Sequence, residues 1–335
     1  MCACKNRCGP HLVSLNLTGE LSYLDSANPT QGRSKQVIAH TGPANCLALL
    51  PSGELASSVN FVSGGDDGRV LTWRDGVATQ VEGLDPATRR THSGKAIGVA
   101  GGFPEGVVVS VGYDDKLKVS GANGVGVARE LNLGSQPVEL AAAPGADLVV
   151  VALADGKALF LRLSVFMGAP APSADADSGV GFFQVALPGT PLALAVSSDG
   201  TECACSVDSV IHVLAVPADG SAAAALTVIS KLEGHRGLVG CLAYSPDHQW
   251  LAAGDANREI KVRCGGDDFF IKTTGKMTTT RGNESREAPI PSASFVLVFR
   301  AKKKLFFLNS LFLLSVYSTC ICVIRCGRAA RGRRK

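Results

Sequence analysis

A pattern of turns and short strands returns along most of this 335-residue chain at a nearly constant spacing. The clearest unit is KLEGHRGLVGCLAYSPDHQWLAAGDANREIKV, from Lys231 to Val262. It contains three short apolar stretches, separated by a Ser-Pro-Asp turn and a Gly-Asp turn, which is typical of antiparallel strands. Five such units begin near His40, His92, Gln136, Thr190 and His235, at separations of 52, 44, 54 and 45 residues. Such a repeat leaves few folds open, because each unit buries its apolar faces only against its neighbours.

The spacing matches that of a WD-type β-propeller, whose blades repeat every 40–45 residues or so before loop insertions. Abundant glycine (38 residues) and few aromatic residues (6%) suit short strands joined by tight turns. We therefore predict an all-β fold, an incomplete WD-type propeller of about five to six blades over residues 11–262. Five units are recognisable, and residues 11–25 supply the closing strands of another. Residues 1–10 are assigned to an N-terminal leader.

Polar residues recur within the units and suggest a structural network. In WD-type blades, a His before the first strand, an Asp in a turn and a Trp on the third strand can bond in series. His40, Asp67 and Trp73 are placed for such a network, and His235 with Asp255 forms a partial version. The equivalent turn elsewhere is expected to hold Asp115, Asp155 and Asp208. Recurrence in several units indicates architecture, whereas a catalytic group is needed once, so the sequence predicts no enzyme.

No motif in the sequence predicts a catalytic, cofactor or metal site. VSGGDDGRV (Val62–Val70) lacks the Gly-Lys-Ser/Thr of a P-loop, and a hairpin turn is expected there. A zinc site on Cys2, Cys4 and Cys8 would need a fourth ligand, with His11 the nearest candidate, but the spacing fits no common zinc module. The eleven cysteines are more simply explained as reduced thiols of a cytosolic protein.

The charge balance divides the chain near Val262. Residues 1–262 contain 18 Lys and Arg against 25 Asp and Glu, whereas residues 263–335 contain 15 against 4. A mildly acidic body is unlike a nucleic-acid binder, so no nucleic-acid partner is expected for it. We treat residues 263–335 as a separate, non-propeller C-terminal tail.

The tail differs from the body in composition as well as charge, and it holds eight of the 19 aromatic residues. Residues 305–324 carry no charge and are numerous enough to span a bilayer, so a membrane anchor is one interpretation. The others are a non-native extension, from a retained intron or a shifted reading frame, and a divergent domain. The abrupt loss of the repeat in mid-unit favours the non-native extension.

Two stretches of the body resemble a particular family. HLVSLNLTGELSYLD (His11–Asp25), followed by VIAHTGPANCLAL (Val37–Leu49), resembles the start of the second propeller of the actin-interacting protein 1 family. YSPDHQWLAAGDANREIKV (Tyr244–Val262) is similar to a late blade of that propeller. The resemblance covers about residues 12–262. It implies two seven-bladed propellers in tandem. The first propeller, and the final blades of the second propeller, have no counterpart in this sequence.

The resemblance also implies a function. Members of that family bind actin filaments decorated with cofilin (actin-depolymerising factor), promote their disassembly and cap barbed ends. The expected partners are thus actin filaments and cofilin, and the expected location is the cytoplasm at the actin cytoskeleton, with a membrane-anchored form through residues 305–324 as the alternative. A generic WD-repeat scaffold for another complex is the alternative function. Candidate partner contacts on the blade rims are Arg69, Lys116, Arg236, Asn257 and Arg258.

Overall fold

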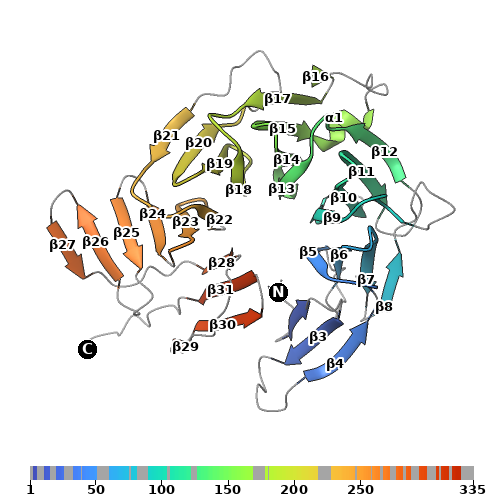
Figure 1. Ribbon diagram of the computed structural model, residues 1–335, viewed down its shortest axis with the longest axis horizontal. Coiled ribbons are helices and arrows are strands. Elements are labelled where there is room, and N and C mark those ends of the chain that lie inside the picture. Colours follow the sequence, from blue (N-terminus) through green and yellow to red (C-terminus); the bar gives the residue numbers. More distant parts are fainter. Residues whose placement is uncertain are drawn as a thin grey trace, which may run out of the picture.

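The computed structural model describes the backbone over most of the predicted body and over short stretches elsewhere (Figure 1). The described residues are 3–5, 11–15, 20–25, 33–38, 40–50, 60–74, 77–80, 90–103, 106–121, 127–168, 178–179, 181–217, 228–245, 247–257, 259–264, 267–271, 277–281, 284–287, 294–299, 307–308, 311–316 and 319–325. Side chains are described for 40–50, 60–73, 90–103, 106–121, 129–168, 181–217, 228–245, 247–257 and 259–263.

Five antiparallel sheets follow one another along the body, and we name them I to V. Sheet I contains β5 (Ala44–Leu49), β6 (Phe61–Gly65), β7 (Val70–Arg74) and β8 (Val77–Gln80). Sheet II contains β9 (Ala96–Ala100), β10 (Val107–Gly112), β11 (Lys116–Gly121) and β12 (Val127–Asn132). Sheet III contains β13 (Pro137–Ala143), β14 (Leu148–Leu153), β15 (Lys157–Arg162), β17 (Phe182–Ala186) and β16 (Ser178–Gly179). Sheet IV contains β18 (Pro191–Val196), β19 (Glu202–Val207), β20 (Val210–Ala215) and β21 (Val228–Leu232).

Sheet V and the sheets at the two ends of the chain contain the other strands that the structure describes. Sheet V runs through β22 (Val239–Tyr244), β23 (Trp250–Asp255), β24 (Ile260–Cys264), β25 (Asp267–Ile271), β26 (Met277–Arg281) and β27 (Glu284–Glu287). The N-terminal sheet contains β1 (Ala3–Lys5), β2 (His11–Leu15), β3 (Glu20–Asp25) and β4 (Arg33–Ile38). The C-terminal sheet contains β28 (Ser294–Phe299), β29 (Phe307–Leu308), β30 (Leu311–Val316) and β31 (Thr319–Arg325). Among the described residues, the helical elements are the 3-10 turn η3 (Pro144–Ala146) and α1 (Leu163–Gly168).

The sheets stand like blades around a common axis (Figure 1). The first strand of each sheet contacts the first strand of the next, from β5 through β9, β13 and β18 to β22. Strand β28 contacts β22 and β23, and the arc stays open between the C-terminal and N-terminal sheets. The predicted all-β, incomplete propeller is thereby confirmed.

Each neighbouring pair of sheets encloses a core of its own. Strand β14 (LVVVAL) is buried along its whole length, and its side chains alternate between two cores because successive strand residues point to opposite faces. Val149 and Val151 pack in the core shared with sheet II, whereas Leu148 and Val150 pack in the core shared with sheet IV. This two-sided burial explains why the middle strands are continuous apolar runs and do not alternate with polar residues.

The boundary placed after Val262 falls inside strand β24. The residues that follow it continue sheet V, because β25 pairs with β24 along its length, with Val262 opposite Phe269. Residues 305–324 contribute to β29, β30 and β31. Within the described residues, no helix has the length and apolar character needed to cross a membrane.

A hairpin turn of sheet I forms a backbone bridge to sheet II. Gly68 has a φ of 72° in the turn between β6 and β7, and its carbonyl oxygen accepts a hydrogen bond of 2.9 Å from the His92 N–H. A Cβ atom added to Gly68 would lie 2.3 Å from the His92 carbonyl oxygen and 2.7 Å from that of Gly94. Glycine is therefore required here both by backbone conformation and by space.

Gly68→Ala is expected to lower the free energy of unfolding by about 3 kcal/mol, since it combines a positive φ with a clash against backbone. The matched control is Gly134→Ala. Gly134 also has a positive φ, 70°, but no described atom within 4 Å of the added Cβ, so a loss of about 1 kcal/mol is expected. Denaturant unfolding of both variants measures the difference. Equal losses would show that the approach of sheet II does not constrain this turn.

Candidate functional site

A buried chain of hydrogen bonds links two strands of sheet I, the turn between them and the loop that enters the sheet. His40 Nδ1 lies 3.0 Å from Asp67 Oδ1, and His40 Nε2 lies 2.8 Å from Ser63 Oγ. The Trp73 indole N–H donates to the same Ser63 oxygen at 2.8 Å. The indole also stacks on Phe61, with ring centroids 5.4 Å apart. The three residues predicted to act in series thus lie together, and Ser63 connects the His to the Trp.

Asp67 is the anchor of the turn that carries this network. Its carboxylate also accepts hydrogen bonds from the backbone N–H groups of Thr41 (2.9 Å) and Arg69 (3.1 Å). Burial alone would raise the pKa of Asp67, but the hydrogen bonds from His40 and these N–H groups, with the His40 charge, outweigh it. The pKa falls from 3.8 to about 2. The carboxylate is therefore ionised across the physiological range.

Sheet II repeats the arrangement without the Trp. His92 Nδ1 lies 2.8 Å from Asp114 Oδ1, and His92 Nε2 lies 2.9 Å from Ser110 Oγ. Ser120 occupies the strand position that Trp73 has in sheet I, and its buried hydroxyl makes no hydrogen bond to a described residue. The Lys118 ammonium lies 3.7 Å from Asp114 and donates to the Thr91 carbonyl at 2.5 Å.

Sheet V has a shorter version of this hydrogen-bond network. His235 Nδ1 lies 3.2 Å from Asp255 Oδ2, and Asp255 also accepts hydrogen bonds from the N–H groups of Asn257 and Glu259. Burial lowers the pKa of His235, against the raising effect of its hydrogen bond to Asp255. His235 is therefore neutral at pH 7, with its proton on the nitrogen that faces Asp255.

The turn residues differ in one respect from the sequence interpretation. In sheet II the carboxylate that faces the His belongs to Asp114, whereas Asp115 has a φ of 56° and occupies the left-handed position that Gly68 has in sheet I. The two adjacent aspartates differ in backbone conformation, which the sequence does not display.

The predicted turn residues of sheets III and IV face no His. In sheet III, Asp155 accepts a hydrogen bond from the Lys157 N–H, and Leu133 occupies the position that His92 has in sheet II. Asp208 has a φ of 53° in a shorter turn.

Sequence reasoning missed Ser63, Ser110 and the His92–Asp114 pair. Each Ser lies four residues before the Asp that faces the His, inside an otherwise apolar strand. That fixed interval, together with a His before the first strand, is the signal that could have found them.

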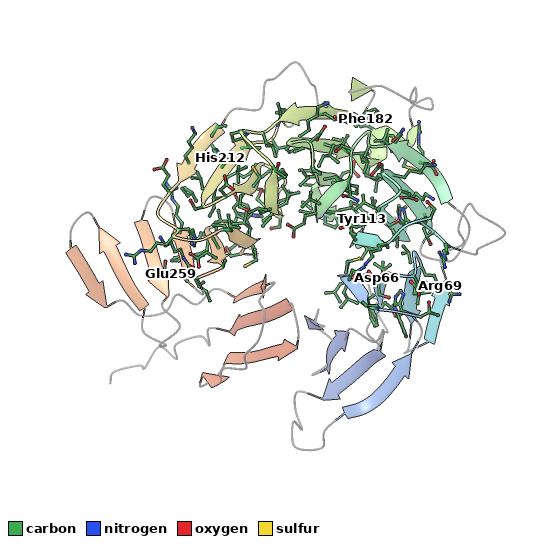
Figure 2. All side chains as sticks on the ribbon, viewed as in Figure 1. Asp66, Arg69, Tyr113, Phe182, His212 and Glu259 are labelled. Atoms are coloured by element: carbon green, nitrogen blue, oxygen red, sulfur yellow. The ribbon has the colours of Figure 1, made fainter. Side chains whose placement is uncertain are left out.

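The predicted partner contacts lie on one side of the sheets, which we name the turn face. It consists of the turns between second and third strands and the loops that enter the first strands. These meet because the start of β5 pairs with the end of β6, Ala44 opposite Gly65. Arg69 and Lys116 follow such turns, Asn257 lies within one and Arg236 lies in an entering loop, whereas Arg258 lies outside the described residues. Figure 2 labels Arg69, with Asp66, Tyr113 and Glu259 also in these turns.

The turn face is mixed in character. Lys116 Nζ lies 2.5 Å from Glu130 Oε1, and Lys95 Nζ lies 2.7 Å from Asp66 Oδ2, so these lysines are already paired. Arg236 and Asn257 are exposed, and Asn257 lies beside Gly237 in the neighbouring loop. Tyr113 and Leu238 expose 48% and 52% of their surface. Such a combination of exposed aromatic, aliphatic and cationic groups suits contact with a protein.

In the part of the chain that the structure describes, no three or more His, Cys, Asp or Glu side chains are grouped so that they could bind a metal ion. The buried His–Asp pairs face structural Ser, Trp and backbone groups. The His–Asp networks therefore hold the turns in place, and the turn face presents a surface to a partner.

The repeats match a known family model. The WD domain, G-beta repeat model matches residues 32–74 and 226–263. Each match begins at the outer strand of one sheet, β4 or β21, and runs through the first three strands of the next. The chain is a WD-repeat protein. Propellers of WD repeats typically serve as binding scaffolds and not as enzymes.

Three curated relatives match about three quarters of this WD-repeat chain. The 66 kDa stress protein of Physarum polycephalum is 30% identical over 258 residues, covering 76% of this chain and 37% of that protein. Actin-interacting protein 1-2 of Arabidopsis thaliana is 28% identical over 256 residues, covering 75% and 37%. WD repeat-containing protein 1 of Gallus gallus is 26% identical over 298 residues, covering 75% and 44%. The chain thus spans well under half the length of these relatives.

A solved structure supports the fold. The β-propeller domain of Cps50 (Swd1) from Myceliophteria thermophila superposes with a TM-score of 0.59 at 13% identity, covering 83% of this chain and 88% of that domain. At this identity the similarity concerns architecture alone.

The pKa of Asp67 leads to a prediction about acid stability. Because the pKa of the Asp67 carboxyl group is lower in the folded protein than in the unfolded chain, its ionised form stabilises the folded state at pH values above about 3.8. This contribution to the free energy of unfolding is lost as the pH falls toward 2. Asp67→Asn should cost about 2 kcal/mol at pH 7, and the difference from the unsubstituted protein should shrink between pH 4 and pH 2. Denaturant unfolding across this range measures it.

The control for this prediction is Asp155→Asn, in the equivalent turn where no His faces the carboxylate. It should change stability by less than about 0.5 kcal/mol. A difference between Asp67→Asn and the unsubstituted protein that stays constant from pH 7 to pH 2 would refute the role of the ionised carboxylate.

Proposed function

We propose that this WD-repeat protein binds actin filaments together with cofilin and promotes filament disassembly, in the cytoplasm at the actin cytoskeleton. The observation that carries the proposal is the 28% identity to Actin-interacting protein 1-2 over three quarters of the chain. The stretch Tyr244–Val262, which resembles a late blade of that family, contains β23, the turn residues Ala256 and Asn257 and the first three residues of β24. That turn lies on the turn face beside Arg236.

The turn face supplies the groups for such contacts. Actin filaments and cofilin are proteins, and protein interfaces favour aromatic and Arg side chains at their centre. Arg236, Asn257, Tyr113 and Leu238 are exposed there. We place the contact on this face, with Arg69 and Lys116 toward sheets I and II.

The alternative function is a WD-repeat scaffold in a complex without actin. The repeats and the fold are shared by both functions, so the partner decides between them. A membrane-anchored form through residues 305–324 is a variant of either.

Cosedimentation with filamentous actin, with and without cofilin, tests the proposal on the full chain. Binding that increases when cofilin coats the filament, with faster loss of polymer, is the expected result. Low binding that cofilin does not change would contradict the proposal and favour the scaffold.

A charge reversal locates the contact. Arg236→Glu should weaken cofilin-dependent cosedimentation about fivefold or more, as interface residues that matter cost over 1 kcal/mol when changed. The matched control is Lys231→Glu, the same change in charge on the exposed outer strand β21. Equal effects of the two variants would mean that overall charge, and not the turn face, determines binding.

A further inference from the structure

Sheet IV ends at its outer strand β21, whose free edge faces away from the propeller axis (Figure 1). Among the described elements, β21 pairs with β20 and with no strand on its other side. Val228 and Ile229 on this strand expose 42% and 50% of their surface. An unpaired edge with exposed aliphatic side chains is a template for a further strand, and folded proteins generally cover or blunt such edges.

The outer strands of sheets II, III and V contact further elements of the chain. In sheet III, β16 adds to β17 in antiparallel pairing, with Ser178 opposite Phe183. In sheet V, β26 adds to β25 in the same orientation. In sheet II, the Arg129 Cζ atom lies 4.6 Å from the centre of the Phe166 ring, and Nη1 donates to the Met167 carbonyl oxygen, which ties β12 to α1. Among the described residues, sheet IV has no such cover on its outer strand.

The side chains of β21 divide between two faces. Lys231 lies opposite His212, and Val228 lies opposite Leu214. His212 and Leu214 are two residues apart on β20 and so share a face, which places Lys231 and Val228 on one face as well. Ile229 is the extra residue of a bulge, where the register shifts. One face of the edge therefore presents a cation and an aliphatic side chain, with Ile229 beside them.

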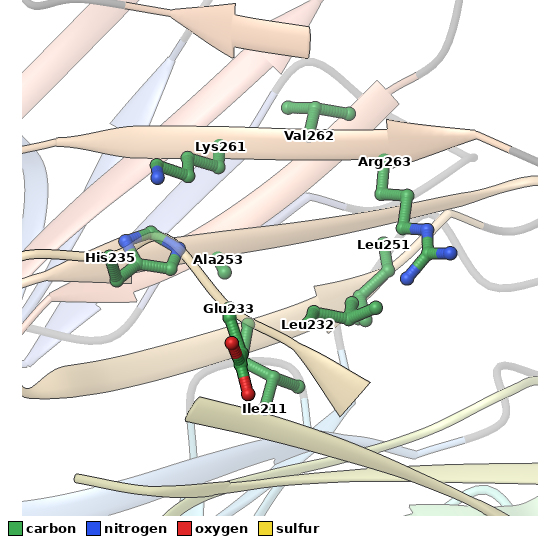
Figure 3. Close-up of a pocket in the computed structure, with 9 residues that line it drawn as sticks. All are labelled: Ile211, Leu232, Glu233, His235, Leu251, Ala253, Lys261, Val262 and Arg263. Atoms are coloured by element: carbon green, nitrogen blue, oxygen red, sulfur yellow. The ribbon is translucent and has the colours of Figure 1, made fainter. Parts of the chain in front are cut away.

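The other face of β21 is held by sheet V. Ser230 Oγ accepts a hydrogen bond of 3.0 Å from Arg263 Nη1, and Leu232 packs against the core shared by sheets IV and V. Figure 3 shows Leu232 and Glu233 on the same side as Ile211, in the pocket between the two sheets. The strand is thus fixed in an extended conformation before a partner arrives, so it loses little conformational entropy on binding.

The charge of the edge selects the partner. Lys231 is exposed, and among the described residues no carboxylate forms an ion pair with it. Glu233, the acidic residue that follows β21, lines the pocket between sheets IV and V. Cross-strand pairs of opposite charge stabilise a sheet, whereas like charges opposite each other destabilise it. An added strand is therefore favoured when it sets a carboxylate opposite Lys231 and aliphatic side chains opposite Val228 and Ile229.

We propose that the outer edge of β21 binds an extended segment of another protein as a fifth strand of sheet IV, antiparallel to β21. In that orientation the segment consists, from its N-terminus, of an acidic residue, a residue opposite Ser230 and two aliphatic residues. Backbone hydrogen bonds supply the affinity, and the cross-strand pairs supply the specificity. The site lies on the outer rim and not on the turn face, and the proposal does not depend on actin binding.

Calorimetric titration of the full chain with the capped peptide Thr-Thr-Glu-Thr-Val-Val-Thr tests the pairing. The matched peptide, with Lys in place of Glu, should bind about fivefold more weakly, because attraction to Lys231 becomes repulsion. Lys231→Glu should reverse this preference. Equal affinities of the two peptides, or no binding of the Glu peptide at millimolar concentration, would overturn the proposal.

Ile229→Thr tests the aliphatic part of the edge, since it keeps a β-branched residue and removes apolar surface. It should weaken binding of the Glu peptide about threefold. The matched control is Val165→Thr, because Val165 on α1 is 48% exposed, and this variant should bind the peptide normally. Equal effects of the two substitutions would place the peptide elsewhere and overturn the proposal.

Methylation of the peptide backbone tests the strand pairing without altering the protein. Alternate residues of a strand direct their N–H groups to opposite edges, so methylation of every second nitrogen blocks one edge only. Of two Glu peptides methylated on the two alternate sets, one should lose binding and the other should keep it. Equal behaviour of the two peptides would overturn the proposal.

A second copy of the chain is the competing occupant of this edge. Sedimentation velocity of the unsubstituted protein and of Ile229→Thr distinguishes the two occupants, and equal sedimentation coefficients are expected. A dimer that Ile229→Thr dissociates would assign the edge to self-association and overturn the proposal.

Discussion

The fold depends on one backbone hydrogen bond that is repeated at every junction from sheet I to sheet V. The carbonyl oxygen of a turn residue with positive φ accepts from an N–H that leads into the next sheet, over 2.8 to 2.9 Å. The four acceptors have φ values of 72°, 56°, 84° and 53°; they are Gly68, Asp115, Gly156 and Asp208. A left-handed residue turns its carbonyl out of the hairpin and toward the neighbour, which a right-handed residue at that position would not do. This bond fixes the approach of adjacent sheets and so the geometry in which their cores close.

The side-chain networks are secondary to that backbone constraint. Sheets I, II and V place a buried His against an Asp, whereas sheet III has Leu133, Val151 and Leu161 at the positions of His40, Ser63 and Trp73. A buried polar network and a well-packed apolar set have similar net stability, provided that every polar atom is paired. Sheet III meets that condition by having no such polar atoms. Sheet V does not meet it, because among the described residues the buried Nε2 of His235 has no hydrogen-bond partner.

The turn face follows from the same geometry. Because first strands start where second strands end, the loops and turns of all five sheets gather on one side of the molecule. Variation there leaves the cores between the sheets untouched, so a partner surface can change while the propeller is preserved. The 13% identity to the Cps50 (Swd1) propeller domain illustrates how much of the sequence is free once the architecture is kept.

The sequence by itself determined the strand repeat, the all-β propeller and the members His40, Asp67 and Trp73 of one network, because these depend on spacing and on residue types that recur. It did not reveal Ser63 and Ser110, which look like ordinary residues of apolar strands, or that Asp114 and not Asp115 faces His92. The boundary after Val262 was inferred from composition, yet strand pairing continues through it, since a strand is completed by its neighbour and not by its charge. Which nitrogen of His235 lacks a partner, and which strands enclose it, was decided only by the tertiary structure, because residues far apart in the chain meet there.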